Sequence, residues 1–481
     1  MRTIIKTLGV LLCFGVASLE AAEPTESKLV GVWRGTLDVG PTKLRIVFDI
    51  KDDGGTLVGT LDSPDQQAFG IPISQIALEG NAVAIELQQI QGRFAGTLSA
   101  DAEQIDGTWS QMGQPFPLLM RRGEKIQPAR RPQEPAAPVP YDAEEVTYKS
   151  AKNVGLAGTL TRPHGNGPFP AVLLITGSGP QDRDETLMGH KPFLVLADHL
   201  TRQGFAVLRV DDRGVGGSTG SVMQSTLRDF ADDALAGVAF LRSRKDIGRI
   251  GLVGHSEGGV VASLAASASN DIEWVVLIAS PGVRIDELLM QQLRTIGTAS
   301  GLSEGVLAFS ESFQRDIFAI LRATSDGAEA ATQIEALWAR RKPETQRMPA
   351  ADQARLPAFE ATLEAQTKMV STPWFRDLLD HDPAVALRQL RVPVLAIFGE
   401  LDMQVPVERN AAALEKALED AQNRDITIKT MPGLNHLMQA ARTGLPAEYA
   451  MIEETFNPAA LDAISTWLRA RAHTREDGRG S

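Results

Sequence analysis

Residues 253–259 read Val-Gly-His-Ser-Glu-Gly-Gly and contain a Gly-x-Ser-x-Gly pentapeptide with Ser256 at its centre. The apolar run 250–253 precedes this serine, and a run of helix-forming residues, 260–268, follows it. A serine carried on a sharp turn between a strand and a helix needs small residues two places before and after it, because larger side chains would collide with the strand and the helix. The pattern therefore favours a nucleophilic Ser256 over the alternative, a plain glycine-rich loop.

A base and an acid for this serine are predicted in two later loops. A serine hydroxyl is a weak nucleophile until a base within hydrogen-bond reach accepts its proton, and that base needs a group that fixes its tautomer. His436 follows a strand predicted over 426–430, and two acids, Glu400 and Asp402, share the turn after a strand predicted over 394–398. The chain order serine, acid, histidine is that of an α/β-hydrolase, in which each residue lies at the carboxyl end of a strand. His436 is therefore predicted to take the serine proton, while one of the two acids stabilises the imidazolium that forms.

The oxyanion of the tetrahedral intermediate requires preorganised N–H donors. One predicted donor is the backbone N–H of Glu257, the residue after the serine, and the other comes from the loop after a strand predicted over 171–175. That loop, residues 176–180, reads Thr-Gly-Ser-Gly-Pro; its glycines allow close approach of the backbone, and Ser178 is the predicted donor. A plain turn is the alternative interpretation of this loop. The charges of residues 182–184 beside it either orient substrate or pair with one another.

No cofactor and no metal are predicted. His255 lies inside the turn that carries the serine and is interpreted as a packing residue. The other histidines show no metal-ligand spacing, and the chain has neither a phosphate-binding loop motif nor a dinucleotide fingerprint. These histidines are His164, His190, His199, His381 and His473.

Residues 141–473 are predicted to form an α/β domain. Near-continuous apolar runs alternate with longer helical segments, which indicates a mostly parallel sheet covered on both faces. A long segment within this region, about 283–388, is rich in Ala, Leu, Glu and Arg and has helical periodicity. Because structureless loops of such length are uncommon, we expect this segment to be a helical cap. The apolar stripe that shows the periodicity, which we expect to serve helix packing, consists of Phe309, Phe313, Ile317 and Leu321.

Residues 24–125 are predicted to form a small all-β domain, a barrel or a sandwich. Apolar and other residues alternate with a period of two, as over 44–50, and glycine and proline turn signals break the runs at short intervals. Trp33 and Trp109 are expected to fill the core of this domain rather than line a ligand cavity. Residues 126–140 contain five prolines and are predicted to form a stiff linker.

The N-terminus is predicted to direct export. Residues 1–22 combine basic residues, an apolar run and small residues, the pattern of a cleavable signal peptide, and the run is too short to span a membrane. The single cysteine, Cys13, lies in this segment, so the mature protein is expected to have neither a disulfide nor a thiol nucleophile. The formal net charge of −12 argues against nucleic acid or an anionic membrane as a partner. We therefore expect an exported protein, periplasmic or secreted, that acts on a small-molecule substrate; the sequence carries no signature of its oligomeric state.

Five motifs in the chain resemble those of one known family. They are Gly-Ser-Gly-Pro-Gln-Asp-Arg-Asp-Glu-Thr at 177–186, Asp-Asp-Arg-Gly-Val-Gly-Gly-Ser-Thr-Gly at 211–220, Gly-His-Ser-Glu-Gly-Gly at 254–259, Pro-Trp-Phe-Arg at 373–376 and Gly-Leu-Asn-His at 433–436. Together they resemble bacterial EstD-type carboxylesterases of the α/β-hydrolase superfamily, over about residues 141–470. The resemblance implies a helical cap and a catalytic triad of Ser256, Asp402 and His436, with Asp402 preferred to Glu400. The β-domain resembles, more vaguely, the lipocalin-like modules attached to some members.

This resemblance implies hydrolysis of carboxylic esters with short to medium acyl chains, through an acyl-enzyme on Ser256 and without a cofactor. Two other functions remain open. An aminopeptidase, or another amide or thioester hydrolase, would use the same triad, and an aminopeptidase would need an acidic residue in the cap to bind a free amino terminus. A non-catalytic binding protein would use the α/β domain as a scaffold, which the complete set of serine, acid and histidine argues against.

Overall fold

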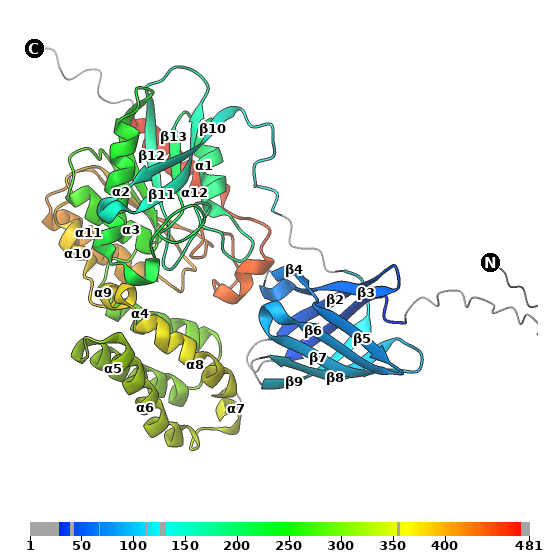
Figure 1. The fold of residues 1–481 in the computed structure, drawn as a ribbon. Coiled ribbons are helices and arrows are strands. Elements are labelled where there is room, and N and C mark those ends of the chain that lie inside the picture. The colour runs from blue at the N-terminus through cyan, green and yellow to red at the C-terminus, as the bar shows by residue number, and fades with distance from the viewer. Residues whose placement is uncertain are drawn as a thin grey trace, which may run out of the picture. The chain divides into compact units, whose positions relative to one another are not determined.

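The computed structural model describes residues 28–38, 43–66, 68–111, 114–125, 131–353 and 356–472. The predicted signal peptide, residues 1–22, lies outside the described residues, as does His473. The chain divides into two compact units (Figure 1), the first within residues 1–126 and the second formed mainly by Gln127–Ser481. In the part of the chain that the structure describes, no helix has the length and apolar character needed to cross a membrane.

The first unit is one nine-stranded sheet in the order β4-β3-β2-β1-β9-β8-β7-β6-β5. Strands β1 and β9, the first and last of the unit in chain order, pair in antiparallel fashion in the middle of this sheet, with Trp33 opposite Arg122. The two edge strands, β4 and β5, follow one another in the chain and are joined by residues 73–74. The Ile73 N–H donates to the Gly59 carbonyl oxygen of β3, and the Ser74 N–H donates to the Glu86 carbonyl oxygen of β6, so the sheet curls back on itself. The predicted all-β domain is confirmed. Its strands are β1 (Gly31–Asp38), β2 (Lys43–Asp53), β3 (Thr56–Ser63), β4 (Ala68–Pro72), β5 (Gln75–Glu79), β6 (Ala82–Leu87), β7 (Gly92–Leu98), β8 (Gln104–Gln111) and β9 (Gln114–Arg122).

The interior of this unit is filled by aromatic and aliphatic side chains. Trp33 and Trp109 are both buried. The Trp33 indole N–H donates to the Leu29 carbonyl oxygen at 2.8 Å, which satisfies its polar atom, and the Trp109 ring packs 6.5 Å from that of Phe48. The prediction that both tryptophans belong to the core is confirmed.

The second unit contains an eight-stranded sheet in the order β10-β11-β13-β12-β14-β15-β16-β17. The pairs β10–β11 and β11–β13 are antiparallel, and all later pairs are parallel. The predicted mostly parallel sheet is confirmed, and each apolar run that predicted it lies on a strand. The strands are β10 (Tyr141–Lys149), β11 (Gly155–Pro163), β12 (Phe169–Ile175), β13 (Ala206–Val210), β14 (Ile247–His255), β15 (Val275–Ile278), β16 (Val394–Gly399) and β17 (Ile426–Met431).

Helices cover both faces of this sheet, which explains why its central strands are apolar throughout. Along β12, Val172 and Leu174 belong to one core, and Ala171 and Leu173 to the other. Helices α1 (Pro192–Arg202) and α12 (Pro458–Ala472) pack over the first of these cores. The second core is covered by α2 (Leu227–Arg242), α3 (Glu257–Ser267) and α11 (Val407–Asp420).

The insertion between β15 and β16 is helical, as the periodicity predicts. Phe313 and Leu321, two members of the predicted stripe, are buried. Phe313 packs against Trp338 and Leu363 from other helices of the insertion, so the stripe serves helix packing. The helices are α4 (Ile285–Ala299), α5 (Glu304–Ala323), α6 (Gly327–Thr345), α7 (Ala350–Gln353), α8 (Leu356–Val370), α9 (Pro373–Leu379) and α10 (Pro383–Leu387).

Candidate active site

Ser256 occupies the turn between the end of β14 and the start of α3. Its backbone has φ 53° and ψ −121°, a conformation that costs a non-glycine residue about 1–3 kcal/mol and persists only when the surroundings impose it. The Ser256 N–H donates to the Ile278 carbonyl oxygen of the adjacent strand at 2.8 Å, which helps to hold the turn. Such strained residues concentrate at functional sites, and the turn has the form that the pentapeptide predicts.

Close backbone contacts explain the two glycines of the pentapeptide. A Cβ atom on Gly254 would lie 2.1 Å from the Gly258 carbonyl oxygen. A Cβ atom on Gly258 would lie 2.1 Å from the Ile175 carbonyl oxygen at the end of β12. Both distances are far below van der Waals contact and involve backbone atoms that cannot rotate away. The serine can therefore occupy this turn only because the residues two places before and after it lack side chains.

His436 and Asp402 lie together at the carboxyl ends of β17 and β16. His436 Nδ1 is 2.8 Å from Asp402 Oδ2, and both side chains are buried. The other carboxylate oxygen of Asp402 accepts the backbone N–H groups of Gln404 and Val405, each at 2.8 Å. Glu400, the rival acid, instead accepts the Gly433 N–H at 2.8 Å. The geometry thus pairs His436 with Asp402 and leaves Glu400 as a support for the histidine loop.

The turn that carries Ser256 contacts the loop that carries His436 through His255, the residue directly before the serine. The His255 and His436 ring centroids are 4.8 Å apart, and His255 Nε2 is 3.0 Å from the His436 carbonyl oxygen. Among the described residues, Ser256 Oγ and the His436 ring share no hydrogen bond. Catalytic hydrogen bonds are often loose in ligand-free structures and tighten when substrate binds.

The predicted oxyanion donors belong to the residue after Ser256 and to the loop that follows β12. Within the described parts of the chain, neither the Ser178 backbone N–H nor the Glu257 backbone N–H has a hydrogen-bond partner. Glu257 is the first residue of α3, where backbone N–H groups lack partners within the helix. The Gly177 N–H, in contrast, donates to Glu185 Oε1 at 2.7 Å, and a Cβ atom on Gly177 would lie only 3.5 Å from the Ser256 Cβ. The backbone of this loop therefore runs directly beside the serine.

Two neighbouring acids, Asp211 and Asp212, hold this loop in place, although no sequence pattern indicates such a role. Asp212 accepts the Thr176 hydroxyl at 2.8 Å and the Gln181 N–H at 2.9 Å. Asp211 accepts both the backbone N–H and the guanidinium of Arg183. In the sequence, Asp211 and Asp212 stand out only as the first two residues of the motif at 211–220, and that motif does not indicate which loop they contact.

The charges of residues 182–184 do not pair with one another through their side chains. Arg183 forms an ion pair with Asp211 at 2.7 Å, and Asp184 forms one with Arg209 of β13. Asp182 accepts the backbone N–H groups of Asp184 and Thr186. Their observed contacts are therefore with the neighbouring strand and loop, which makes them supports of the loop.

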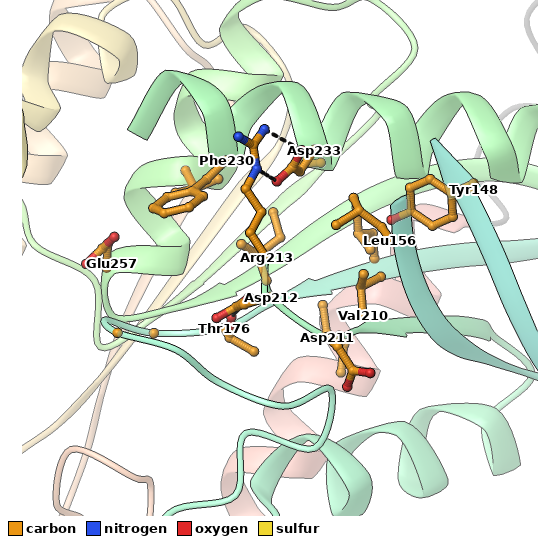
Figure 2. A pocket seen from close by; sticks show the side chains of 17 residues that line it. Tyr148, Leu156, Thr176, Val210, Asp211, Asp212, Arg213, Phe230, Asp233 and Glu257 are labelled. Atoms are coloured by element: carbon orange, nitrogen blue, oxygen red, sulfur yellow. Dashed lines mark hydrogen bonds and ion pairs between the residues drawn. The ribbon is translucent and has the colours of Figure 1, made fainter. Parts of the chain in front are cut away.

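A cavity of about 70 Å³ adjoins the loop that carries Ser178 (Figure 2). Glu257 lies at one end of the cavity and Tyr148 at the other, and Phe230 and Leu156 contribute apolar walls. Asp212 also lines it, and burial, reinforced by the neighbouring carboxylates Glu257 and Glu185, raises the pKa of Asp212 to about 8. This carboxyl is therefore largely protonated near neutral pH.

The Glu257 side chain connects the serine turn to the helical insertion. Its Oε1 accepts the indole N–H of Trp374, on helix α9, at 3.0 Å, and both side chains are buried. Burial raises the pKa of the Glu257 carboxyl, although the hydrogen bond from Trp374 opposes this shift. Trp374 belongs to the motif at 373–376, yet no local pattern indicates that its partner lies 117 positions earlier.

The described residues contain no group of three or more His, Cys, Asp or Glu side chains placed to hold a metal ion. His255 and His436 make the contacts described above. His190 is also buried, and its ring nitrogens lie 3.0 Å from Thr455 Oγ1 and 2.9 Å from the Tyr449 carbonyl oxygen.

Comparison with known proteins gives one family and several relatives. Residues 191–440 match the family model Hydrolase_4, described as serine aminopeptidase, S33. The chain is 30% identical over 331 residues to Esterase EstD of Thermotoga maritima, which covers 68% of each protein. It is also 30% identical over 160 residues to human dipeptidyl peptidase 8, which covers 30% of this chain and 18% of the peptidase. Among solved structures, the Pyrococcus furiosus esterase Pf2001 matches 72% of this chain and 100% of that one, with 14% identity and a TM-score of 0.44.

Proposed function

The chain belongs to the Hydrolase_4 family of α/β-hydrolases and is a homologue of an esterase, and from this premise we propose that it cleaves carboxylic esters through an acyl-enzyme on Ser256. The observation that carries the proposal is the 2.8 Å contact between His436 and Asp402 in the loop that packs against the strained turn of Ser256. A buried histidine held by a carboxylate beside a serine on such a turn is the arrangement that activates a hydroxyl nucleophile.

In the proposed mechanism, His436 takes the Ser256 proton as Oγ attacks the ester carbonyl carbon. The carbonyl oxygen becomes an oxyanion, which the backbone N–H groups of Ser178 and Glu257 stabilise. His436 then gives the proton to the departing alcohol, leaving an acyl-enzyme, while Asp402 stabilises the imidazolium in between. A water molecule, activated by His436 in the same way, releases the acid and regenerates the serine.

We further propose that the acyl chain is short to medium in length and that the protein is exported. The resemblance of the motifs at 177–186, 254–259 and 433–436 to those of EstD-type carboxylesterases supports this acyl length. The apolar and small-residue pattern of residues 1–22 supports export to the periplasm or medium. Fractionation of cells that express the full chain, with sequencing of the mature N-terminus, tests export; an intact N-terminus on cytoplasmic protein would contradict it.

Replacement of the nucleophile tests the proposed reaction. We expect Ser256→Ala to lose p-nitrophenyl butyrate turnover by about 10³-fold or more, with the fold retained. The matched control is Ser263→Ala on the same helix, whose hydroxyl donates to the Gly259 carbonyl oxygen and which is expected to keep turnover. Mass spectrometry after treatment with an aryl phosphonate should place the adduct on Ser256. Turnover that survives in Ser256→Ala would rule out this assignment.

Amide hydrolysis is the second candidate, and the description of the matching family as serine aminopeptidase favours testing it. The same triad would cleave an amide, but leaving-group and substrate contacts would differ. Comparing aminoacyl-arylamides with p-nitrophenyl acetate and butyrate on the purified protein separates the two functions. Strong amide turnover with negligible ester turnover would replace the ester proposal.

A further inference from the structure

Both ring nitrogens of the buried His255 face hydrogen-bond acceptors. Nδ1 lies 2.9 Å from Glu185 Oε1, and Nε2 lies 3.0 Å from the His436 carbonyl oxygen. A neutral imidazole has one N–H and can satisfy only one acceptor, whereas the imidazolium has two. Both contacts are made together when His255 is an imidazolium, which donates one N–H to the Glu185 side chain and the other to the His436 carbonyl oxygen. In agreement, burial works to lower the pKa of His255, but the Glu185 carboxylate, the hydrogen bond to the His436 carbonyl oxygen and the charge of Asp402 together outweigh it, so the pKa is raised.

A single oxygen of Glu185 serves two of the loops around Ser256. Oε1 accepts the Gly177 N–H at 2.7 Å as well as the N–H of His255. Oε2 has no partner among the described residues, and the side chain borders a cavity of about 10 Å³ lined by apolar residues, including Phe193. In such an apolar environment the attraction between the carboxylate and the imidazolium is stronger than at a surface.

The backbone around Glu185 is itself constrained. Glu185 has φ 54°, and its N–H donates to the Asp182 carbonyl oxygen at 2.9 Å. The residues before it are tied to the sheet by the ion pairs of Arg183 with Asp211 and of Asp184 with Arg209. The carboxylate is thus fixed in space and can define the position of the groups that bind to it.

Resting on the function proposed above, we infer that Glu185 and His255 are positioning residues that together set the oxyanion loop and the His436 loop relative to Ser256. Glu185 holds the peptide before Ser178 through the Gly177 N–H, and His255 holds the backbone of His436 through its carbonyl oxygen. Displacement of a catalytic group by about 1 Å costs about 100-fold in rate, so the pair is expected to affect kcat.

Glu185→Gln separates the two contacts of the carboxylate. The amide oxygen can still accept the Gly177 N–H and a neutral His255 that is protonated on Nδ1. In that tautomer Nε2 has no proton to donate to the His436 carbonyl oxygen, so only the contact to the His436 loop is lost. We expect kcat to fall by about 10- to 100-fold while KM changes less than about threefold.

A double-mutant cycle with His255→Phe tests whether Glu185 acts on the His436 loop through His255. Because the intermediary is missing in His255→Phe, adding Glu185→Gln to that variant is expected to lower kcat by less than about twofold. Should His255→Phe not fold, His255→Gln replaces it in the cycle. Active enzyme is counted by titration with an aryl phosphonate, so that loss of folded protein is not read as loss of kcat.

Asp229→Asn is the matched control for loss of a buried carboxylate. Asp229 contacts Lys152 and Arg213 in a part of the fold outside the proposed machinery, and its replacement should lower the thermal midpoint but leave kcat unchanged. The inference would be overturned if Glu185→Gln and His255→Phe both kept full kcat. It would also be overturned if the fold-loss of kcat in the double variant equalled the product of the two single losses, because the residues would then act independently. Failure of the proposed function would be seen differently: the wild-type protein would not hydrolyse esters, or the Ser256→Ala variant would still hydrolyse them.

Discussion

Asp402→Asn offers a demanding test of the proposed triad, because the surroundings of Asp402 dictate how an asparagine would lie. Asp402 Oδ1 accepts the N–H groups of Gln404 and Val405, each at 2.8 Å, and Oδ2 faces His436 Nδ1. An amide NH₂ group cannot replace the oxygen that faces two N–H donors. The asparagine oxygen must therefore keep those contacts, and its NH₂ group must face His436.

This orientation forces the histidine into the wrong tautomer. With an N–H donor opposite Nδ1, His436 must carry its proton on Nε2, the nitrogen that has to accept the proton of Ser256. Forcing this tautomer in a triad costs about 10⁴-fold in kcat, which corresponds to about 5.5 kcal/mol of transition-state stabilisation. The two backbone hydrogen bonds of residue 402 survive, so we expect the fold to be retained.

The assay is kcat for p-nitrophenyl butyrate, normalised to protein that retains wild-type circular dichroism and thermal unfolding. Glu400→Gln is the matched control, since an amide oxygen can still accept the Gly433 N–H that Glu400 now binds. It should keep kcat within about threefold. If Asp402→Asn kept kcat within tenfold of the wild type, or if Glu400→Gln lost as much kcat as Asp402→Asn, Asp402 would not be the acid of the triad.

Two further predictions concern stability. Trp374→Phe removes the N–H that donates to the buried Glu257 carboxyl. The variant should lose about 1–3 kcal/mol more free energy of unfolding in urea than Trp338→Phe, in which a buried ring that packs against other rings is replaced. Equal losses in the two variants would contradict this prediction. The pKa of Asp212 is raised to about 8 in the folded state. Between about pH 4 and 8 the folded state therefore holds a proton that the unfolded state has released. The free energy of unfolding consequently falls as the pH rises over this range, by up to about 1.4 kcal/mol per pH unit. Asp212→Asn should flatten this dependence in urea titrations across that range, whereas parallel curves for variant and wild type would count against it.

The strands and helices that could be predicted are those with a strong local pattern. Strands β12 to β16 are buried on both faces, and their continuous apolar runs revealed them. The antiparallel strand β10 lacks such a run because it lies at the sheet edge with much of its surface exposed. Strand β11 is largely buried, but its sequence, Gly-Leu-Ala-Gly-Thr-Leu-Thr-Arg-Pro, mixes small and polar residues with the apolar ones and so has no continuous apolar run. The helical insertion was predicted as a whole, whereas the boundaries of its helices depend on capping contacts such as that of Thr372 with the Phe375 N–H.

The sequence by itself determined the serine turn, the strands beside it and the order of the candidate catalytic residues. These features depend on neighbouring residues only, namely glycines that leave room for a backbone crossing and apolar runs that must be buried. The local pattern leaves open which acid meets His436, because Glu400 and Asp402 share one turn; the family resemblance implies Asp402, and the tertiary structure shows that Asp402 contacts His436 while Glu400 points to Gly433. The tertiary structure alone joined Glu185 to His255 across 70 positions and Trp374 to Glu257 across 117, because contacts between distant segments arise from packing and leave no periodic trace in the chain.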